Sequence, residues 1–262
     1  MFRRTDMHLD EVTEDLMFGL EPERIRKIVD ELRGRLSGES RLGSRFKADG
    51  LSLEGDGTLI FEAEVDGVAQ KKLALEIAAA MPDVVATVDR VRVKPASPMG
   101  DAEILARLRR EYAEDPALAS LNVEEIRGGH CETISKSPDA HGDIDYEVVD
   151  GVVTLNGSVP GLTIKRYIGL LAWWVPGSRD VINGIVAGDD DEDSADRIAE
   201  AVRLALEKDP YVDAAQVKVG VRNRTVRLTG YLPSDDQRRM AENDAWYIFG
   251  VDEVVNEIAV GP

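Results

Sequence analysis

The chain has 262 residues, of which 43% are hydrophobic and 31% charged, a composition typical of a globular protein with two or three small domains. Its formal net charge of −18 repels phosphate backbones at long range, so we expect no nucleic-acid partner. The single cysteine, Cys131, excludes an internal disulfide framework.

Residues 1–20 begin with two arginines but place acidic residues where a secretory signal needs an apolar core, so we interpret them as a tail. No window reaches the roughly 18 uninterrupted apolar residues that cross a bilayer, and no transmembrane segment is expected. As written, the chain is expected in the cytoplasm. A removed leader would instead indicate a periplasmic or envelope-associated protein.

Residues 21–94 are the first predicted module. The pair Asp56-Gly57 is suited to a two-residue hairpin turn, because Asp-Gly readily adopts positive φ. Residues 67–80 are predicted to form a helix after this hairpin. The proline-rich segment 94–100 is typical of a linker and ends the module.

Residues 101–187 are the second predicted module, with a hairpin turn at Asp150-Gly151 and a helix over 162–175. An insertion at 127–143, "RGGHCETISKSPDAHGD", precedes the hairpin. It forms either a flexible polar loop or a transition-metal site, although its spacing matches no standard site. The candidate ligands are His130, Cys131 and His141.

Residues 193–260 are the third predicted module, and an acidic run at 187–193 precedes it. Apolar residues at helical spacing predict a helix from the cap Ser194 to the stop at Asp209-Pro210. Two alternating strands are predicted to meet at Asn223-Arg224. A helix over 235–248 and a strand over 254–260 complete the module.

The modules are copies of one unit, because residues 144–187 align with 217–260 without a gap. Each unit runs α-β-β-α-β, and a strand-helix-strand crossover returns parallel to its start. We therefore predict an α/β protein of the α+β kind, in which each module has a mixed three-stranded sheet with two helices on one face. The recurring pairs include Gly157/Gly230, Trp173/Trp246, Gly177/Gly250, Asn183/Asn256 and Ile185/Ile258.

Several of these motifs together resemble a known family. A helix stop at "DP", the hairpin strands "VVTLNGSVP" and "TVRLTGYLP", an Ala-Trp pair, and "VVNEIAV" are similar to the BON domain (bacterial OsmY and nodulation). The resemblance covers residues 101–260 and, more faintly, 21–93. It implies modules without catalytic residues, found in bacterial stress and envelope proteins, that bind phospholipids, other hydrophobic ligands or partner proteins. Some intracellular members bind potassium.

The aromatic residues of the second helices are the candidate ligand or partner surface. Trp173 and Trp246 lie off the apolar stripe of their predicted helices, next to Trp174 and Tyr247. Each indole either wedges against the first helix of its own module or forms a surface that meets another repeat, a protomer or an apolar ligand.

The outward faces of the two predicted sheets differ in charge. They are either solvated or complementary faces through which the second and third modules dock. The acidic face carries Asp143, Asp145 and Glu147, and the basic face carries Lys218, Arg222 and Arg227.

Two recurring residue types are interpreted as structural. Asn183 and Asn256 are expected to tie down a neighbouring loop through backbone hydrogen bonds, because a buried amide needs partners. Gly157 and Gly230 are expected at a bulge or a close approach of a helix.

The sequence contains no nucleotide-binding loop, nucleophile elbow or His-Glu-x-x-His motif, and no cofactor is predicted. We therefore expect a non-enzymatic binding or adaptor protein, related to stress or the envelope, that binds a partner protein or a hydrophobic ligand. The alternatives are an intracellular potassium sensor and a protein that binds phospholipid surfaces. Nothing in the sequence indicates an oligomeric state.

Overall fold

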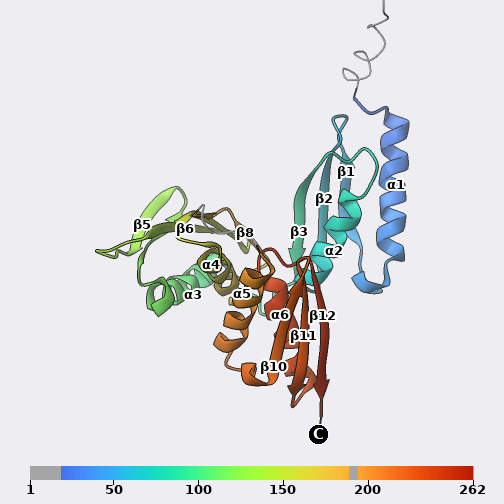
Figure 1. The fold of residues 1–262 in the computed structure, drawn as a ribbon. Coiled ribbons are helices and arrows are strands. Elements are labelled where there is room, and N and C mark those ends of the chain that lie inside the picture. The colour runs from blue at the N-terminus through green and yellow to red at the C-terminus, as the bar shows by residue number, and fades with distance from the viewer. Residues whose placement is uncertain (1–18, 189–193, 262) are drawn as a thin grey trace, which may run out of the picture. The chain divides into compact units, whose positions relative to one another are not determined.

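The computed structural model describes residues 19–188 and 194–261, so most of the predicted tail and most of the acidic linker lie outside the described residues. The chain divides into two compact units (Figure 1). One holds the first module, up to residue 92. The other holds the second and third modules together, from residue 93 onward, with the short segment 66–69.

The first module has the predicted element order. It runs α1 (Pro22–Gly38), the short helix η1 (Ser40–Leu42), β1 (Ala48–Leu53), β2 (Thr58–Val65), α2 (Val68–Ala79) and β3 (Ala86–Val93). The strands form one sheet in the order β1-β2-β3, with β1 and β2 antiparallel. Leu32 and Leu36 of α1 and Phe61 and Val91 of the sheet are fully buried, and they form the centre of its core.

The hairpin turn of the first module is wider than the predicted two-residue turn. Gly57 has a φ of 84°, whereas Asp56 is not in the positive-φ region. The Gly57 N–H donates to the Glu54 carbonyl at 3.0 Å, and the Glu54 N–H donates to the Thr58 carbonyl at 2.9 Å. A turn that closes on a left-handed glycine needs only that residue at positive φ.

The second module contains the predicted unit and a larger sheet. Its elements are α3 (Asp101–Glu114), η2 (Pro116–Leu118), β4 (Leu121–Arg127), β5 (His130–Ser135), β6 (Gly142–Val149), β7 (Val152–Val159), α4 (Leu162–Trp174), β8 (Asp180–Asn183) and β9 (Val186–Ala187). The strand order is β5-β4-β6-β7-β8, and β9 also pairs with β7. The turn at Asp150-Gly151 is confirmed, with φ values of 53° and 76°.

The interpretation of residues 127–143 as a flexible polar loop is wrong for much of the segment. Strands β4 and β5 form an antiparallel hairpin that turns at Gly128-Gly129, and β4 then pairs in parallel with β6. Leu121, Val123 and Glu125 alternate inward along β4. The alternation starts before the insertion and was missed because Glu125, a charged residue, occupies one of the inward positions.

The third module matches the predicted unit closely. It consists of α5 (Ala195–Lys208), η3 (Ala214–Gln216), β10 (Val217–Arg222), β11 (Thr225–Leu232), α6 (Asp235–Tyr247) and β12 (Glu253–Val260). The Ser194 side chain caps α5 by accepting from the Arg197 N–H, and Asn223 and Arg224 both have positive φ at the hairpin turn. Strand β11 pairs antiparallel with β10 and parallel with β12, which confirms the mixed three-stranded sheet.

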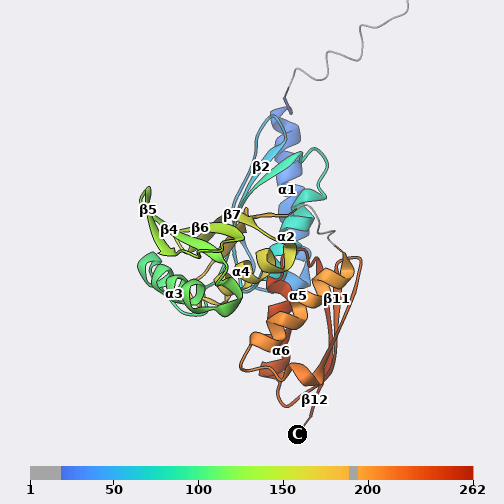
Figure 2. The same cartoon turned by 60° about the vertical axis from the view of Figure 1, so that its left-hand side comes forward.

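The second and third modules share one hydrophobic core. Buried residues of both modules form a continuous cluster, and α4 of the second module packs against α5 and α6 of the third (Figure 2). Residues from Arg166 to Ala172 of α4 are all buried. Helix α4 is therefore buried on all sides over this stretch, whereas a helix at the surface of a sheet buries only one stripe.

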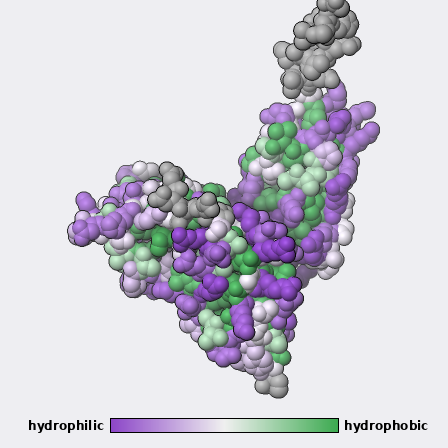
Figure 3. All heavy atoms as spheres, in the orientation of Figure 1, coloured by the Kyte–Doolittle hydropathy of each residue, from purple (hydrophilic) through white to green (hydrophobic). Residues whose placement is uncertain are grey.

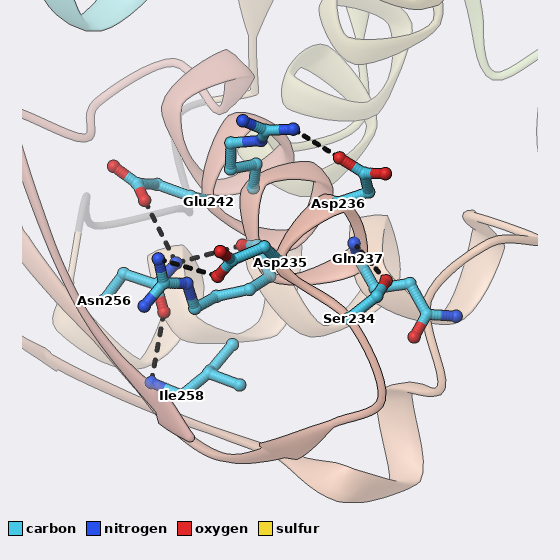
Figure 4. A network of polar contacts seen from close by, with 9 residues as sticks. Ser234, Asp235, Asp236, Gln237, Glu242, Asn256 and Ile258 are labelled. Carbon is cyan, nitrogen blue, oxygen red and sulfur yellow. Dashed lines mark hydrogen bonds and ion pairs between the residues drawn. The ribbon is translucent and has the colours of Figure 1, made fainter. Parts of the chain in front are cut away.

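The recurring asparagines tie the last strand of each module to its second helix. The Asn256 side chain donates from Nδ2 to the Arg238 carbonyl at 3.0 Å and to Glu242 Oε2 at 3.0 Å, and its Oδ1 accepts from the Ile258 N–H (Figure 4). Asn183 makes the same two backbone bonds, to the Lys165 carbonyl and from the Ile185 N–H. The asparagines make the expected backbone hydrogen bonds, but the prediction of a loop as their partner is wrong, because the acceptor carbonyls lie on helices α4 and α6.

The recurring glycines accommodate a neighbouring strand rather than a helix. Gly157 and Gly230 have φ values of 116° and 135°. A Cβ atom would lie 2.1 Å from the Asp143 carbonyl oxygen at Gly157 and 1.9 Å from the Gln216 carbonyl oxygen at Gly230. No side chain fits at either position.

We expect Gly230→Ala to lower the free energy of unfolding by about 1–3 kcal/mol, because alanine at this position has an unfavourable φ and its Cβ clashes with the backbone. Urea unfolding followed by circular dichroism measures this change. Gly220→Ala is the matched control on β10, where an added Cβ has no atom within 4 Å. Equal stabilities of the two variants would contradict the assignment.

Candidate ligand-binding site between the second and third modules

The aromatic residues singled out in the sequence lie at or near the junction of the second and third modules. The Trp173 ring of α4 stacks on the Tyr247 ring of α6, with centroids 5.5 Å apart and planes 7° apart. Trp174 donates from Nε1 to Asp244 Oδ1 at 2.9 Å. Trp246 is half-buried against the shared core. Through this stack Trp173 contacts the other repeat, which is one of the predicted alternatives. That Trp173 also binds a ligand stays a prediction.

Two basic residues of α4 hold the segment that follows α6. Arg166 is fully buried, and its Nε donates to the Phe249 carbonyl at 2.8 Å. The Lys165 ammonium lies 4.7 Å from the centroid of the Phe249 ring, within the range of a cation–π contact. These contacts fix the third module against α4.

A cavity of about 470 Å³ opens between α3 and α4 of the second module and α6 and the turn after α5 of the third. Its volume is in the range of small-molecule sites, about 300–1,000 Å³. Apolar and aromatic side chains form much of its lining, and Tyr211 is 67% exposed at its edge. These side chains are Leu171, Trp174, Val175, Tyr211, Met240 and Tyr247.

The carboxyl group of Asp244 is the most unusual polar group in the lining. Asp244 is only 3% exposed, and within residues 19–188 and 194–261 its Oδ2 has no hydrogen-bond partner. Burial raises the pKa of Asp244 to about 8; the hydrogen bond from Trp174 opposes this rise, and the adjacent Asp209 carboxylate adds to it. Asp244 is therefore mostly protonated at neutral pH.

The remaining charged residues of the lining have partners of their own. On α3, Arg107 pairs with Glu103 at 3.7 Å and Arg110 with Glu111 at 3.4 Å. After α5, the Asp209 Oδ1 accepts from the Tyr211 N–H at 2.8 Å. The site thus combines two adjacent carboxyl groups with two arginines that already have carboxylate partners.

The structure does not bring the acidic and basic sheet faces together. The second and third modules meet through their helices, so the outward positions Asp143, Asp145 and Glu147 do not oppose Lys218, Arg222 and Arg227. Asp145 accepts instead from Asn156 at 3.1 Å, and Arg227 pairs with Glu257 of its own sheet at 3.4 Å. Docking through helices buries far more apolar surface than two charged faces offer.

The structure does not assemble the candidate metal ligands of the insertion either. His130 and Cys131 are exposed on β5, and Cys131 donates from Sγ to Glu124 Oε2 at 3.0 Å. The backbone N–H of His141 donates to the Ser120 carbonyl. In residues 19–188 and 194–261, no group of three or more His, Cys, Asp and Glu side chains could hold a metal ion.

Of the residues that line the cavity, the sequence indicated Trp174 and Tyr247 but not Asp244, Asp209 or the residues of α3. Asp244 occupies an apolar position of its helix and corresponds to Leu171 in the second module, and that substitution in the repeat was the available signal. The side chains of α3 gave no signal, because nothing in the local sequence shows that α3 and α6 lie at the same cavity.

The family comparison identifies the two modules. Residues 131–189 and 194–262 each match the family model "BON domain", so the chain carries two BON domains, as the motifs predicted. The degenerate first copy is not among the matches. BON domains are generally non-catalytic binding domains, and a binding role follows for this pair of modules.

Comparisons with individual proteins add little. No curated protein matches the sequence. Among solved structures, the chain is similar to the C-terminal domain of CdsD, described as the structural protein of the type III secretion system of Chlamydia trachomatis, at 15% identity over 85% of this chain and 95% of that chain. A second structure of CdsD gives 14% identity over 88% and 93%. The TM-score is 0.24 in both cases and supports no argument.

In the part of the chain that the structure describes, none of the helices has the length and apolar character that a bilayer crossing requires. On the face drawn in Figure 3, hydrophobic residues occur in small groups between hydrophilic ones.

We expect Asp244→Asn to become more stable than the wild type as the pH rises from about 4 to about 8. The folded wild type holds a proton on Asp244 in this range, whereas the unfolded chain, with a pKa of about 3.9, has lost it. Burial of Asp244 therefore costs up to about 1.4 kcal/mol per pH unit, and the amide avoids this cost.

Urea unfolding of both proteins at several pH values measures the difference. Asp236→Asn is the control, because Asp236 lies on the same helix but is exposed. A stability difference that does not change with pH would contradict the assignment.

Proposed function

We propose that the second and third modules together bind a small hydrophobic ligand in the cavity between α3, α4 and α6. The protein would then act as a non-catalytic ligand-binding scaffold in a stress or envelope context, in keeping with the BON domains that it carries. The observation that supports this proposal is the cavity of about 470 Å³, built jointly by both modules.

The shape and lining of the cavity favour a small molecule. Ligand sites are commonly concave and apolar, with a few converging polar groups that orient the ligand. Here Leu171, Val175 and Met240 offer aliphatic surface, and Trp174 and Tyr247 offer aromatic surface. Asp244 and Asp209 supply polar groups on one side. The stacked Trp173 and Tyr247 hold one wall in place before any ligand arrives.

A neutral dye whose fluorescence rises in apolar surroundings, N-phenyl-1-naphthylamine, tests the proposal. We expect saturable binding to the full chain with a single class of site. Met240→Trp should weaken this binding by about tenfold or more, because the larger side chain fills the cavity. Fluorescence titration measures both affinities.

The matched control is Val260→Trp, which adds the same indole at a partly exposed position of β12 outside the cavity. It should leave dye affinity unchanged. The proposal fails if the dye does not bind saturably, or if Met240→Trp and Val260→Trp bind it equally well.

A further inference from the structure

We propose that the ligand of this cavity is an amphipathic organic ammonium ion, whose head group pairs with Asp244 and Asp209 while its apolar body lies against Trp174, Tyr247 and Leu171. This inference rests on the proposed function and names the chemical class of the ligand. It is argued from the polar groups that the fold leaves without partners.

The first observation is the Asp244 carboxyl group. Asp244 is only 3% exposed, and its Oδ1 accepts from Trp174. In the described part of the chain its Oδ2 receives no hydrogen bond from a donor group, and its neighbour Asp209 is another carboxyl, with which it can pair only through a shared proton. A buried acceptor without a donor is costly, and folded proteins rarely leave one. Since Asp244 lines the cavity, a donor on the ligand would satisfy this oxygen.

The second observation is the charge around Asp244. Asp209, from the turn after α5, is its carboxylate neighbour, and neither residue has an ion-pair partner within residues 19–188 and 194–261. From α3, Arg107 and Arg110 also line the cavity, but they pair with Glu103 and Glu111. From α4, Trp174 contributes only a neutral N–H donor. The Asp209 carboxylate, next to the protonated Asp244 carboxyl, is thus the charge of the cavity that an ammonium ion would compensate.

The third observation is the aromatic lining. Trp174, Tyr211 and Tyr247 lie in the same cavity as the two carboxyl groups. Aromatic faces attract cations through their quadrupole, and they bind the apolar body of the ligand equally well. An amphipathic carboxylate would instead meet the repulsion of Asp209. A neutral alcohol would leave the Asp209 carboxylate without a cationic partner.

Binding of an ammonium ion is expected to release a proton. Burial and the charge of Asp209 raise the pKa of Asp244 to about 8, so the free protein is mostly protonated there at pH 7. Tyr247, on the same helix, has a pKa of about 12 and stays neutral. An ammonium ion favours the ionised carboxylate, and its affinity should therefore rise by about tenfold between pH 7 and pH 9.

Titration calorimetry of the full chain with n-hexylammonium, 1-hexanol and hexanoate tests the inference. At pH 9 we expect n-hexylammonium, which stays mostly protonated like a lysine side chain, to bind at least about tenfold more tightly than either of the other two probes. At pH 7, buffers of different ionisation enthalpy should reveal the released proton.

Asp244→Asn should lower the affinity for n-hexylammonium by about tenfold or more and remove its pH dependence, while 1-hexanol binding changes by less than about twofold. Asp236→Asn is the matched control and should bind all three probes as the wild type does. Should Asp244→Asn fail to fold, the pH dependence of n-hexylammonium affinity in the wild type still tests the inference.

Equal affinities for the three probes, or an n-hexylammonium affinity that does not change between pH 7 and pH 9, would overturn the inference. If the neutral dye binds but n-hexylammonium does not, the inference fails and the proposed function stands. If neither the dye nor any of the three probes binds, both fail.

Discussion

The enclosure of helix α4 determines how the second and third modules are built into one unit. Seven consecutive residues of this helix, Arg166–Ala172, are buried, and α4 packs against helices of both modules. A helix that lies on a single sheet buries one stripe, whereas α4 also needs apolar surface from the other repeat. The shared core therefore follows from the apolar sequence "LTIKRYIGLLAWW", which has no polar face along most of its length.

Because α4 is enclosed by both repeats, polar groups at this junction, such as Arg166 and Asp244, are shielded from water. Arg166 is fully buried and donates to the Phe249 carbonyl, while Trp174 donates to the buried Asp244. Each contact joins the two repeats, because one partner comes from α4 and the other from α6 or the segment after it. Trp174 and Asp244 also line the cavity, so their hydrogen bond both joins the repeats and shapes the candidate site.

Most of the fold could be predicted from the sequence, because its signals are local. The cap Ser194, the turn pairs Asp150-Gly151 and Asn223-Arg224, and the period-two alternation of β10 and β11 each depend on residues close in the chain. The β4-β5 hairpin was missed because buried Glu125 interrupts its apolar alternation. Glu125 is held there by Arg109 at 3.1 Å and Tyr146 at 3.1 Å, and such partners are invisible to a local pattern.

The candidate site was predictable only in part. The repeat drew attention to Trp173, Trp174, Trp246 and Tyr247, but it could not say which surfaces face each other. The only sequence signal at Asp244 was its correspondence to Leu171 in the repeat, because a single aspartate on a polar helix is ordinary until tertiary packing removes it from water. The structure supplies that packing through Trp174 and Asp209, which are distant from Asp244 in the chain.

The asparagine bonds described above also constrain how these modules can vary in length. Asn183 and Asn256 each reach back 18 positions to a helix carbonyl, so the stretch from that carbonyl to the strand is the same in both repeats. Extra residues inside this stretch would pull the amide away from its acceptor. Strands β4 and β5 of the second module lie upstream of the hairpin, outside this stretch. In these two repeats, the half that the asparagine holds keeps its length, and the added strands lie in the other half.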